Sequence, residues 1–174
     1  MKVSQIRLKT SLKDEIIEVL NKQVQREAQT SAIYLSMSSW LQTQGLIHTA
    51  SFFRKQSEEE RTHMFKIFDY ILELGAHAIS PEIKNIPSDF SNLRDILDEF
   101  LELEIKNTES LNHIADLAMK NKDYQTFNLM SWFLQEQIEE EDTARRTIEI
   151  YELIGTENGG LFNIDKNIGK MNEA

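Results

Sequence analysis

The stretch SEEERTHM, residues 57–64, sets a carboxylate and an imidazole on what should be the apolar face of a helix. Because residues three and four apart share one face of a helix, Glu60 and His63 fall in line with Phe53 and Ile67. A helix of a globular protein buries that face. An isolated ionised carboxylate in a dry interior costs several kcal/mol, so Glu60 requires a compensating partner inside the fold.

Length and composition restrict the kind of protein that surrounds this stretch. A chain of 174 residues with 40% hydrophobic residues suits one domain with a substantial core, so we expect a single domain over residues 1–174. The absence of cysteine excludes disulfides, Cys-ligated zinc and rubredoxin-type iron centres. The start, MKVSQIRLKT, lacks the apolar core of a signal peptide, and no apolar run is long enough to cross a membrane. We therefore expect a soluble, cytoplasmic protein.

The net charge of -10 bears on the choice of partners. Nucleic-acid binding is driven by Lys and Arg side chains that neutralise phosphates, so this charge argues against a nucleic-acid partner. Cations are the favoured partners, although acidity that only serves solubility also explains the charge.

Apolar residues recur with helical spacing along most of the chain. Both prolines, Pro81 and Pro87, lie in the long segment without this spacing, residues 76–92. Residues 1–10 form an extension ahead of the first helix. The pattern predicts four long helices and a short final one, at residues 12–43, 46–74, 93–121, 124–155 and 160–171.

Capping residues mark several of the expected helix ends. Ser11 followed by Asp14 resembles an N-cap box for the first helix. Asn92 and Asp123 stand directly before the third and fourth helices, and Gly75 suits the C-terminal cap of the second.

The lengths of the connections predict the topology. Turns of a few residues join the first helix to the second and the third to the fourth, so each pair is expected to be antiparallel. The crossover of residues 76–92 is long enough to run the length of the bundle, which makes the second and third helices parallel. The expected fold is all-α, a long four-helix bundle with one long crossover and a short fifth helix.

Each long helix carries a polar, metal-competent side chain near the middle of its apolar stripe. The fourth helix is an example, with the expected stripe Met130, Phe133, Gln137, Glu140, Ala144, Ile148 and Tyr151. The two helical pairs also share one spacing. Glu60 follows Glu27 by 33 positions, Gln137 follows Glu104 by 33, and His63 and Glu140 each come three residues later. Each pair can therefore direct three ligands at one point.

Four buried carboxylates, those of Glu27, Glu60, Glu104 and Glu140, would overwhelm an ordinary folding stability unless they were neutralised. Two divalent cations supply the four positive charges. Carboxylate oxygens with a single imidazole favour Fe(II) or Mn(II). The alternative is a purely structural role, which requires Arg or Lys in the same seam, and the stripes contain neither.

These residues resemble the non-haem bacterial ferritins from about Leu12 to Met171. The resemblance rests on the Glu-x32-Glu-x2-His pattern, the long crossover and the run QEQIEEE at residues 135–141. Bacterioferritins carry a second Glu-x-x-His where this chain has Gln137-x-x-Glu140, and a haem-ligating Met where it has Arg61. We therefore expect no haem. Rubrerythrins are excluded because their iron domain needs cysteine.

The resemblance implies a di-iron centre in which Glu60 bridges the two ions. Its ligands would be Glu27, Glu60 and His63 at the first iron and Glu60, Glu104 and Glu140 at the second. Gln137 would lie beside the pair and position oxygen or water. A possible third iron site would use Glu59, Glu136 and Glu139 with Glu140 shared, although a solvated acidic face explains these three glutamates as well.

Two aromatic residues are candidates for supporting roles. Tyr34 lies two turns after Glu27 on the same stripe, where the resemblance implies a hydrogen bond to a ligand or a contribution of an electron, and core packing is the alternative. Trp132 could relay an electron or simply pack. Four residues receive no role: Trp40, His48, His77 and His113.

By resemblance we expect a ferroxidase that oxidises Fe(II) with O2 or H2O2 and stores the product as mineral inside a hollow shell of 24 subunits. The final helix would lie near the four-fold axes, and Asp116 and Asp123 could help draw cations into an access channel. One alternative is a discrete di-iron or di-manganese oxidoreductase without mineral storage. Another is a metal-free helical protein whose seam glutamates pair with basic residues of a partner.

Overall fold

The computed structural model describes residues 9–173, so most of the expected extension, residues 1–8, lies outside the described part together with residue 174. The described residues form helices and contain no strand. The helices are α1 (Asp14–Thr43), α2 (Ile47–Glu73), α3 (Leu93–Lys120), α4 (Tyr124–Ile154) and α5 (Gly160–Lys170), followed by a 3₁₀ turn, η1 (Met171–Glu173).

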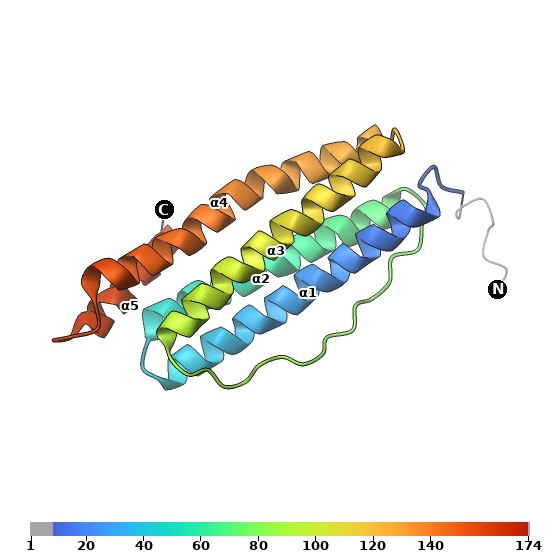
Figure 1. Cartoon of the computed structure of the whole chain (residues 1–174). Coiled ribbons are helices and arrows are strands. Elements are labelled where there is room, and N and C mark those ends of the chain that lie inside the picture. The colour runs from blue at the N-terminus through green and yellow to red at the C-terminus, as the bar shows by residue number, and fades with distance from the viewer. Residues whose placement is uncertain (1–8, 174) are drawn as a thin grey trace.

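Figure 1 shows the four long helices side by side as a bundle, with α5 folded back at one end. The pairs α1/α2 and α3/α4 are antiparallel hairpins. The extended segment between α2 and α3 runs the length of the bundle, so that α2 and α3 point the same way (Figure 1). The expected all-α four-helix bundle with a long crossover and a short fifth helix is confirmed. None of the helices in the described part of the chain combines the length and apolar character needed to span a bilayer.

The helix ends agree with the capping signals except at the first. Asn92 accepts a hydrogen bond from the backbone N–H of Asp95 at 3.0 Å, and Asp123 caps α4 in the same way. Gly75 has a φ of +80° and closes α2. The prediction that Ser11 caps the first helix is wrong. α1 begins only at Asp14, and Leu12, whose side chain is buried in the core, lies in the non-helical chain ahead of it.

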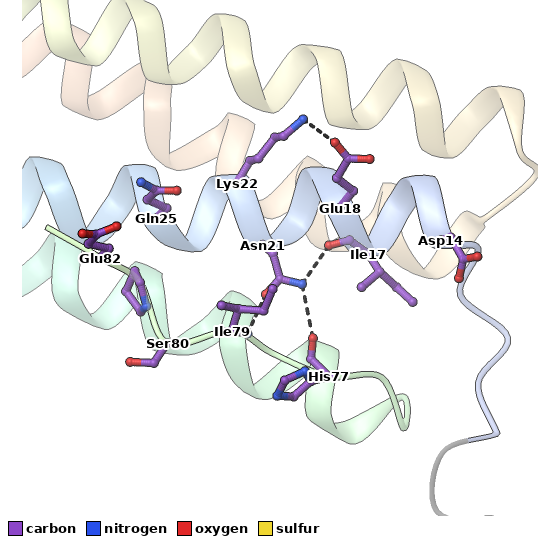
Figure 2. Close-up of a pocket in the computed structure, with 11 residues that line it drawn as sticks. Asp14, Ile17, Glu18, Asn21, Lys22, Gln25, His77, Ile79, Ser80 and Glu82 are labelled. Carbon is purple, nitrogen blue, oxygen red and sulfur yellow. Dashed lines mark hydrogen bonds and ion pairs between the residues drawn. The ribbon is translucent and has the colours of Figure 1, made fainter. Parts of the chain in front are cut away.

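The crossover is attached to α1 by three polar side chains spaced about two helical turns apart, Asn21, Gln29 and Ser36. Each binds the backbone of the crossover. Figure 2 shows Asn21 reaching across from α1 to this segment. The backbone partners belong to His77 and Ile79 for Asn21, to Lys84 for Gln29 and to Pro87 for Ser36.

The core consists of two apolar clusters separated by a polar layer. One cluster, toward the α5 end, contains the edge-to-face rings of Tyr34, Phe53 and Phe100. The other, toward the opposite end, includes Leu20 and Phe133. Between them lies a layer of buried polar side chains: Gln23, Glu27, Glu60, His63, Glu104, Asn107 and Gln137. Five of these residues, Glu27, Glu60, His63, Glu104 and Gln137, therefore lie in the middle of the bundle, where the stripes predicted them, whereas Gln23 and Asn107 were not predicted there.

The stripe of α4 departs from the expectation after Ala144. Thr147 and Ile150 are buried, whereas Ile148 and Tyr151 are only partly buried. The predicted stripe continued from Ala144 to Ile148, four positions on, but the helix buries Thr147, three positions on. Thr147 is tolerated there because its hydroxyl donates to the carbonyl of Ala144 at 2.8 Å.

Candidate metal centre

The first half of the candidate centre comes from the hairpin α1/α2. Glu27 projects from α1, and Glu60 and His63 project from α2, one turn apart. One ligand atom of each lies within 4.8 Å of the others, and all three side chains are buried. Helical steps of three and four keep these residues on the apolar faces of their helices, and the packing of α1 against α2 brings them to one point.

This cluster contains polar atoms that no protein group satisfies. Within the described residues, Glu27 Oε2, Glu60 Oε2 and His63 Nδ1 are buried and have no hydrogen-bond partner. Buried polar atoms almost always have a partner, so three together are exceptional. Two carboxylate oxygens and one imidazole nitrogen are a donor set suited to a borderline divalent cation such as Fe(II). The residues present therefore fit a metal ion.

The second half comes from the hairpin α3/α4. Glu104 is buried, and its two carboxylate oxygens accept hydrogen bonds from the hydroxyl of Tyr34 and from Gln137 Nε2, the latter at 3.0 Å. Glu140 is only partly buried. Neither Glu104 nor Glu140 belongs to the close cluster of Glu27, Glu60 and His63.

Burial, and then mutual repulsion, raises the pKa values of Glu60, Glu104 and Glu140. Burial, followed by the charges of Glu27 and then Glu104 and Glu140, raises the pKa of Glu60 well above its ordinary value. Burial raises the pKa of Glu104 to about 7, although the hydrogen bonds from Tyr34 and Gln137 lower it. Without a cation, the site therefore favours protons on its carboxyls near neutral pH.

The residues expected at a third site surround Glu140. Burial, then the charge of Glu104 and then those of Glu59, Glu136 and Glu139, raises the pKa of Glu140 to about 8. Glu59 and Glu136 are partly buried and Glu139 is exposed. The three glutamates thus lie near Glu140 but at the edge of the buried seam, an arrangement compatible with a third cation or with a solvated acidic face.

Tyr34 is fully buried beside the centre. Its hydroxyl donates to Glu104 Oε1, and its ring packs edge-on against Phe53 and Phe100. Burial first, and then the charges of Glu104 and Glu60, raise the pKa of Tyr34 well above its ordinary value, so the hydroxyl keeps its proton. The ring thus packs in the core while the hydroxyl orients a carboxylate.

Other side chains singled out in the sequence have different surroundings. The ring of Trp132 lies edge-on to His63, with centroids 5.8 Å apart, and the Lys66 ammonium stands 3.7 Å over it. Asp116 pairs with Lys120 at 2.5 Å, and Asp123 is the N-cap of α4. Both aspartates therefore already have partners within the subunit.

Two amide side chains that adjoin the centre, those of Gln23 and Asn107, were not predicted from the sequence. Gln23 Nε2 donates to Glu27 Oε1 at 2.6 Å, and Asn107 lies between Gln23 and Gln137. A signal was present, because Gln23 stands one turn before Glu27 and Asn107 one turn after Glu104, each on the face of the ligand.

Comparisons with known proteins agree with this arrangement. A family model described as a ferritin-like domain matches residues 17–154. The bacterial non-heme ferritin of Escherichia coli O157:H7 is 36% identical over 163 residues, which cover 92% of this chain and 97% of the relative. That of Campylobacter jejuni is 33% identical over 157 residues, or 90% and 94% of the two chains.

Similar solved structures have the same bundle. An open-pore ferritin from the hyperthermophilic archaeon Archaeoglobus fulgidus superimposes with a TM-score of 0.88 at 30% sequence identity. The match covers 91% of this chain and 97% of the archaeal chain. The likeness thus extends to the arrangement of the helices that carry the candidate ligands.

Proposed function

Because this chain belongs to the ferritin family, we propose that it stores iron by oxidising Fe(II) at the buried carboxylate centre and depositing the Fe(III) product inside a hollow protein shell. Residues 1–174 act as one ferritin-like domain in the cytoplasm. Iron is the substrate and cargo of this reaction. The proposal includes no haem, since Arg61 stands at the position where bacterioferritins carry a haem-ligating Met.

One observation carries the proposal: three buried ligand atoms, from Glu27, Glu60 and His63, converge without a protein partner. No Lys or Arg of the described residues forms an ion pair with these carboxylates. A structural role would demand such a pair.

The chemistry follows from how the carboxylates hold two ions. Glu60 bridges the first ion, bound by Glu27 and His63, and the second, bound by Glu104 and Glu140. Fe(II) displaces the protons that the raised pKa values keep on these carboxyls. Each Fe(II) gives one electron, and the two electrons with two protons reduce O2 to H2O2, or H2O2 to two waters. Holding both ions on shared carboxylates allows the two electrons to leave together.

Several finer features belong to the same proposal. Gln137 orients oxygen or water beside the pair, and Tyr34 orients Glu104. Glu59, Glu136 and Glu139 hold a third iron with Glu140. Twenty-four copies form the shell, with α5 near its four-fold axes. Asp116 and Asp123 remain the candidates for an access channel.

The deciding experiment measures iron retained per subunit after aerobic loading with a large excess of Fe(II). Mineral storage predicts tens of irons or more, whereas a discrete di-iron oxidoreductase retains only about two. Glu60→Ala should abolish rapid oxidation. The matched control is Glu102→Ala, which removes an exposed glutamate of α3. Retention of no iron by the unmodified protein would refute both metal-dependent functions.

A further inference from the structure

A chain of hydrogen-bonded carboxamides crosses the bundle interior beside the metal centre. It links α1, α3 and α4 through Gln23, Asn107 and Gln137, whose side chains are only 1%, 2% and 2% exposed. One end of the chain reaches Glu27 and the other reaches Glu104. These carboxylates come from the two different hairpins of the bundle, so the chain connects the two halves of the site.

Each amide of this chain has a defined orientation. Gln23 Nε2 donates to Glu27 Oε1 and to Asn107 Oδ1, both at 2.6 Å, while Gln23 Oε1 accepts from the Ser110 hydroxyl at 2.7 Å. Asn107 Nδ2 donates to Gln137 Oε1 at 3.4 Å. Flipping any one amide would set like groups against each other, so each orientation is fixed: Gln23 donates toward both ends, and Asn107 and Gln137 donate toward Glu104.

The chain occupies specific oxygens and leaves others open. Gln23 engages Glu27 Oε1, and the buried atom without a partner is Glu27 Oε2, the oxygen available to a cation. Gln137 Nε2 donates to Glu104 Oε2 at 3.0 Å, while Tyr34 engages the other oxygen. Fixing one oxygen of a carboxylate restricts the direction in which the second can coordinate.

We propose that Gln23 and Asn107 are positioning residues for divalent cations. Gln23 orients the carboxylate of Glu27 toward the first ion, and Asn107 couples this orientation, through Gln137, to that of Glu104 at the second ion. The proposal rests on the proposed function, because it concerns the geometry of the same two-ion site. It adds that the two ion positions share one hydrogen-bonded support. Neither Gln23 nor Asn107 touches the ions.

Anaerobic titration with Co²⁺, followed by its visible d–d absorption, tests this without oxidation chemistry. Gln23→Leu and Asn107→Leu should each weaken Co²⁺ binding by roughly tenfold and change the absorption bands, as is typical when the outer partner of a ligand is lost. The matched control is Gln25→Leu, two residues along α1, where the glutamine is exposed. Its affinity and spectrum should equal those of the unmodified protein.

The double variant gives the sharpest discrimination. Because both residues belong to one chain, Gln23→Leu with Asn107→Leu should cost no more than the larger single effect. Additive losses of Co²⁺ affinity would mean that the two amides act independently, and would overturn the proposal that the two ion positions share one hydrogen-bonded support. Unchanged affinity and spectra in both single variants would overturn the positioning role.

A milder variant covers the case in which the leucine variants do not fold. Ser110→Ala removes one hydroxyl from the partly buried outer end of the chain and frees the Gln23 amide to rotate. We expect an altered Co²⁺ spectrum, and an unaltered one would count against the proposal. Failure of this inference leaves iron storage intact, since the unmodified protein would still bind Co²⁺ and retain iron. If the unmodified protein binds no Co²⁺ and retains no iron, the proposed function itself fails.

Discussion

The carboxyl side chains of the centre make the metal-free protein sensitive to pH in an unusual direction. Glu104 and Glu140 have pKa values of about 7 and about 8 in the folded protein, against 4.5 in an unfolded chain. Between about pH 5 and pH 8 the folded state therefore binds more protons than the unfolded state. Stability is greatest below the unfolded pKa and falls as pH rises, by at most about 1.4 kcal/mol per pH unit for each group.

We predict that the urea midpoint of chelator-treated protein decreases between pH 5.5 and pH 8. Glu140→Gln should flatten this slope, because its amide cannot titrate, whereas Glu102→Gln at an exposed site should leave it unchanged. A midpoint that rises steadily over the same range would show that these carboxyls are ionised at little cost in the folded protein.

At the scale of the helices, α1, α2 and α3 end in the same type of C-terminal cap, but the capping position holds glycine in two of them and lysine in the third. The N–H of Gly45 bonds to the carbonyl of Gln42, and Gly75 and Lys122 make the equivalent bond at the ends of α2 and α3. Lys122 has a φ of +58°, a region that costs a residue with a side chain about 1 kcal/mol.

Substitutions at two of these caps, Lys122→Gly and Gly45→Ala, should change the free energy of unfolding in opposite directions. Lys122→Gly relieves the backbone strain and should stabilise the protein by up to about 1 kcal/mol, reduced by the greater freedom of glycine in the unfolded chain. Gly45→Ala should destabilise by about 1 kcal/mol through backbone strain alone, since no atom lies within 4 Å of the added Cβ. Thermal unfolding measures both, and a Lys122→Ala variant, which keeps the strain, is the control for loss of the side chain.

The short helix α5 supplies the cap that α2 lacks. No side chain near Leu46 caps α2, and Asp165 from α5 instead accepts hydrogen bonds from the backbone N–H groups of Thr49 at 2.7 Å and His48 at 3.3 Å. The carboxylate also meets the positive end of the α2 dipole. Close approach of the two helices depends on Gly169, where an added Cβ would stand 2.5 Å from His48 Cβ.

We predict that Gly169→Ala separates α5 from α2, because the clash is with a Cβ that cannot turn aside. Proteolysis in the linker at residues 155–159 should become faster. Asp165→Leu should have a similar effect through loss of the cap, about 0.5–2 kcal/mol. The exposed Lys166→Ala on the same helix is the control. Equal protease resistance in all three variants would mean that α5 docks through other contacts.

At the scale of the whole molecule, the predictable features are those with a local signature. Asn92 and Asp123 marked helix starts in the sequence. The stripe positions of Glu27, Glu60 and His63 predicted one shared point, since helical spacing puts each on the apolar face and the short turn between α1 and α2 packs these faces together. The cap from Asp165 was not predictable because its partners lie 116 and 117 residues away. Gln23 and Asn107 escaped notice because amides are ordinary helix residues until a neighbour such as Glu27 is known to be a ligand.

The arrangement of the core implies that a divalent cation stabilises the bundle as a whole. Two apolar clusters flank a layer whose carboxyls repel each other, so the middle of the molecule gains least from packing. A cation bound only by the folded state adds stability that grows with its concentration, about 2.7 kcal/mol at one hundred times Kd. Zn²⁺ suits the test because it binds imidazole and carboxylate without redox chemistry.

We predict that the order of stability between the unmodified protein and Glu60→Gln reverses when Zn²⁺ is added. Without metal at pH 7.5, Glu60→Gln should unfold at an equal or higher temperature, because a neutral amide replaces a carboxyl that is costly to ionise. With Zn²⁺, the unmodified protein should gain several kcal/mol and the variant much less. Glu102→Gln should follow the unmodified protein in both conditions. If Zn²⁺ raised the unfolding temperature of Glu60→Gln as much as that of the unmodified protein, the stabilising cation would bind elsewhere. Neutralisation of the buried carboxylates by a cation would then be refuted.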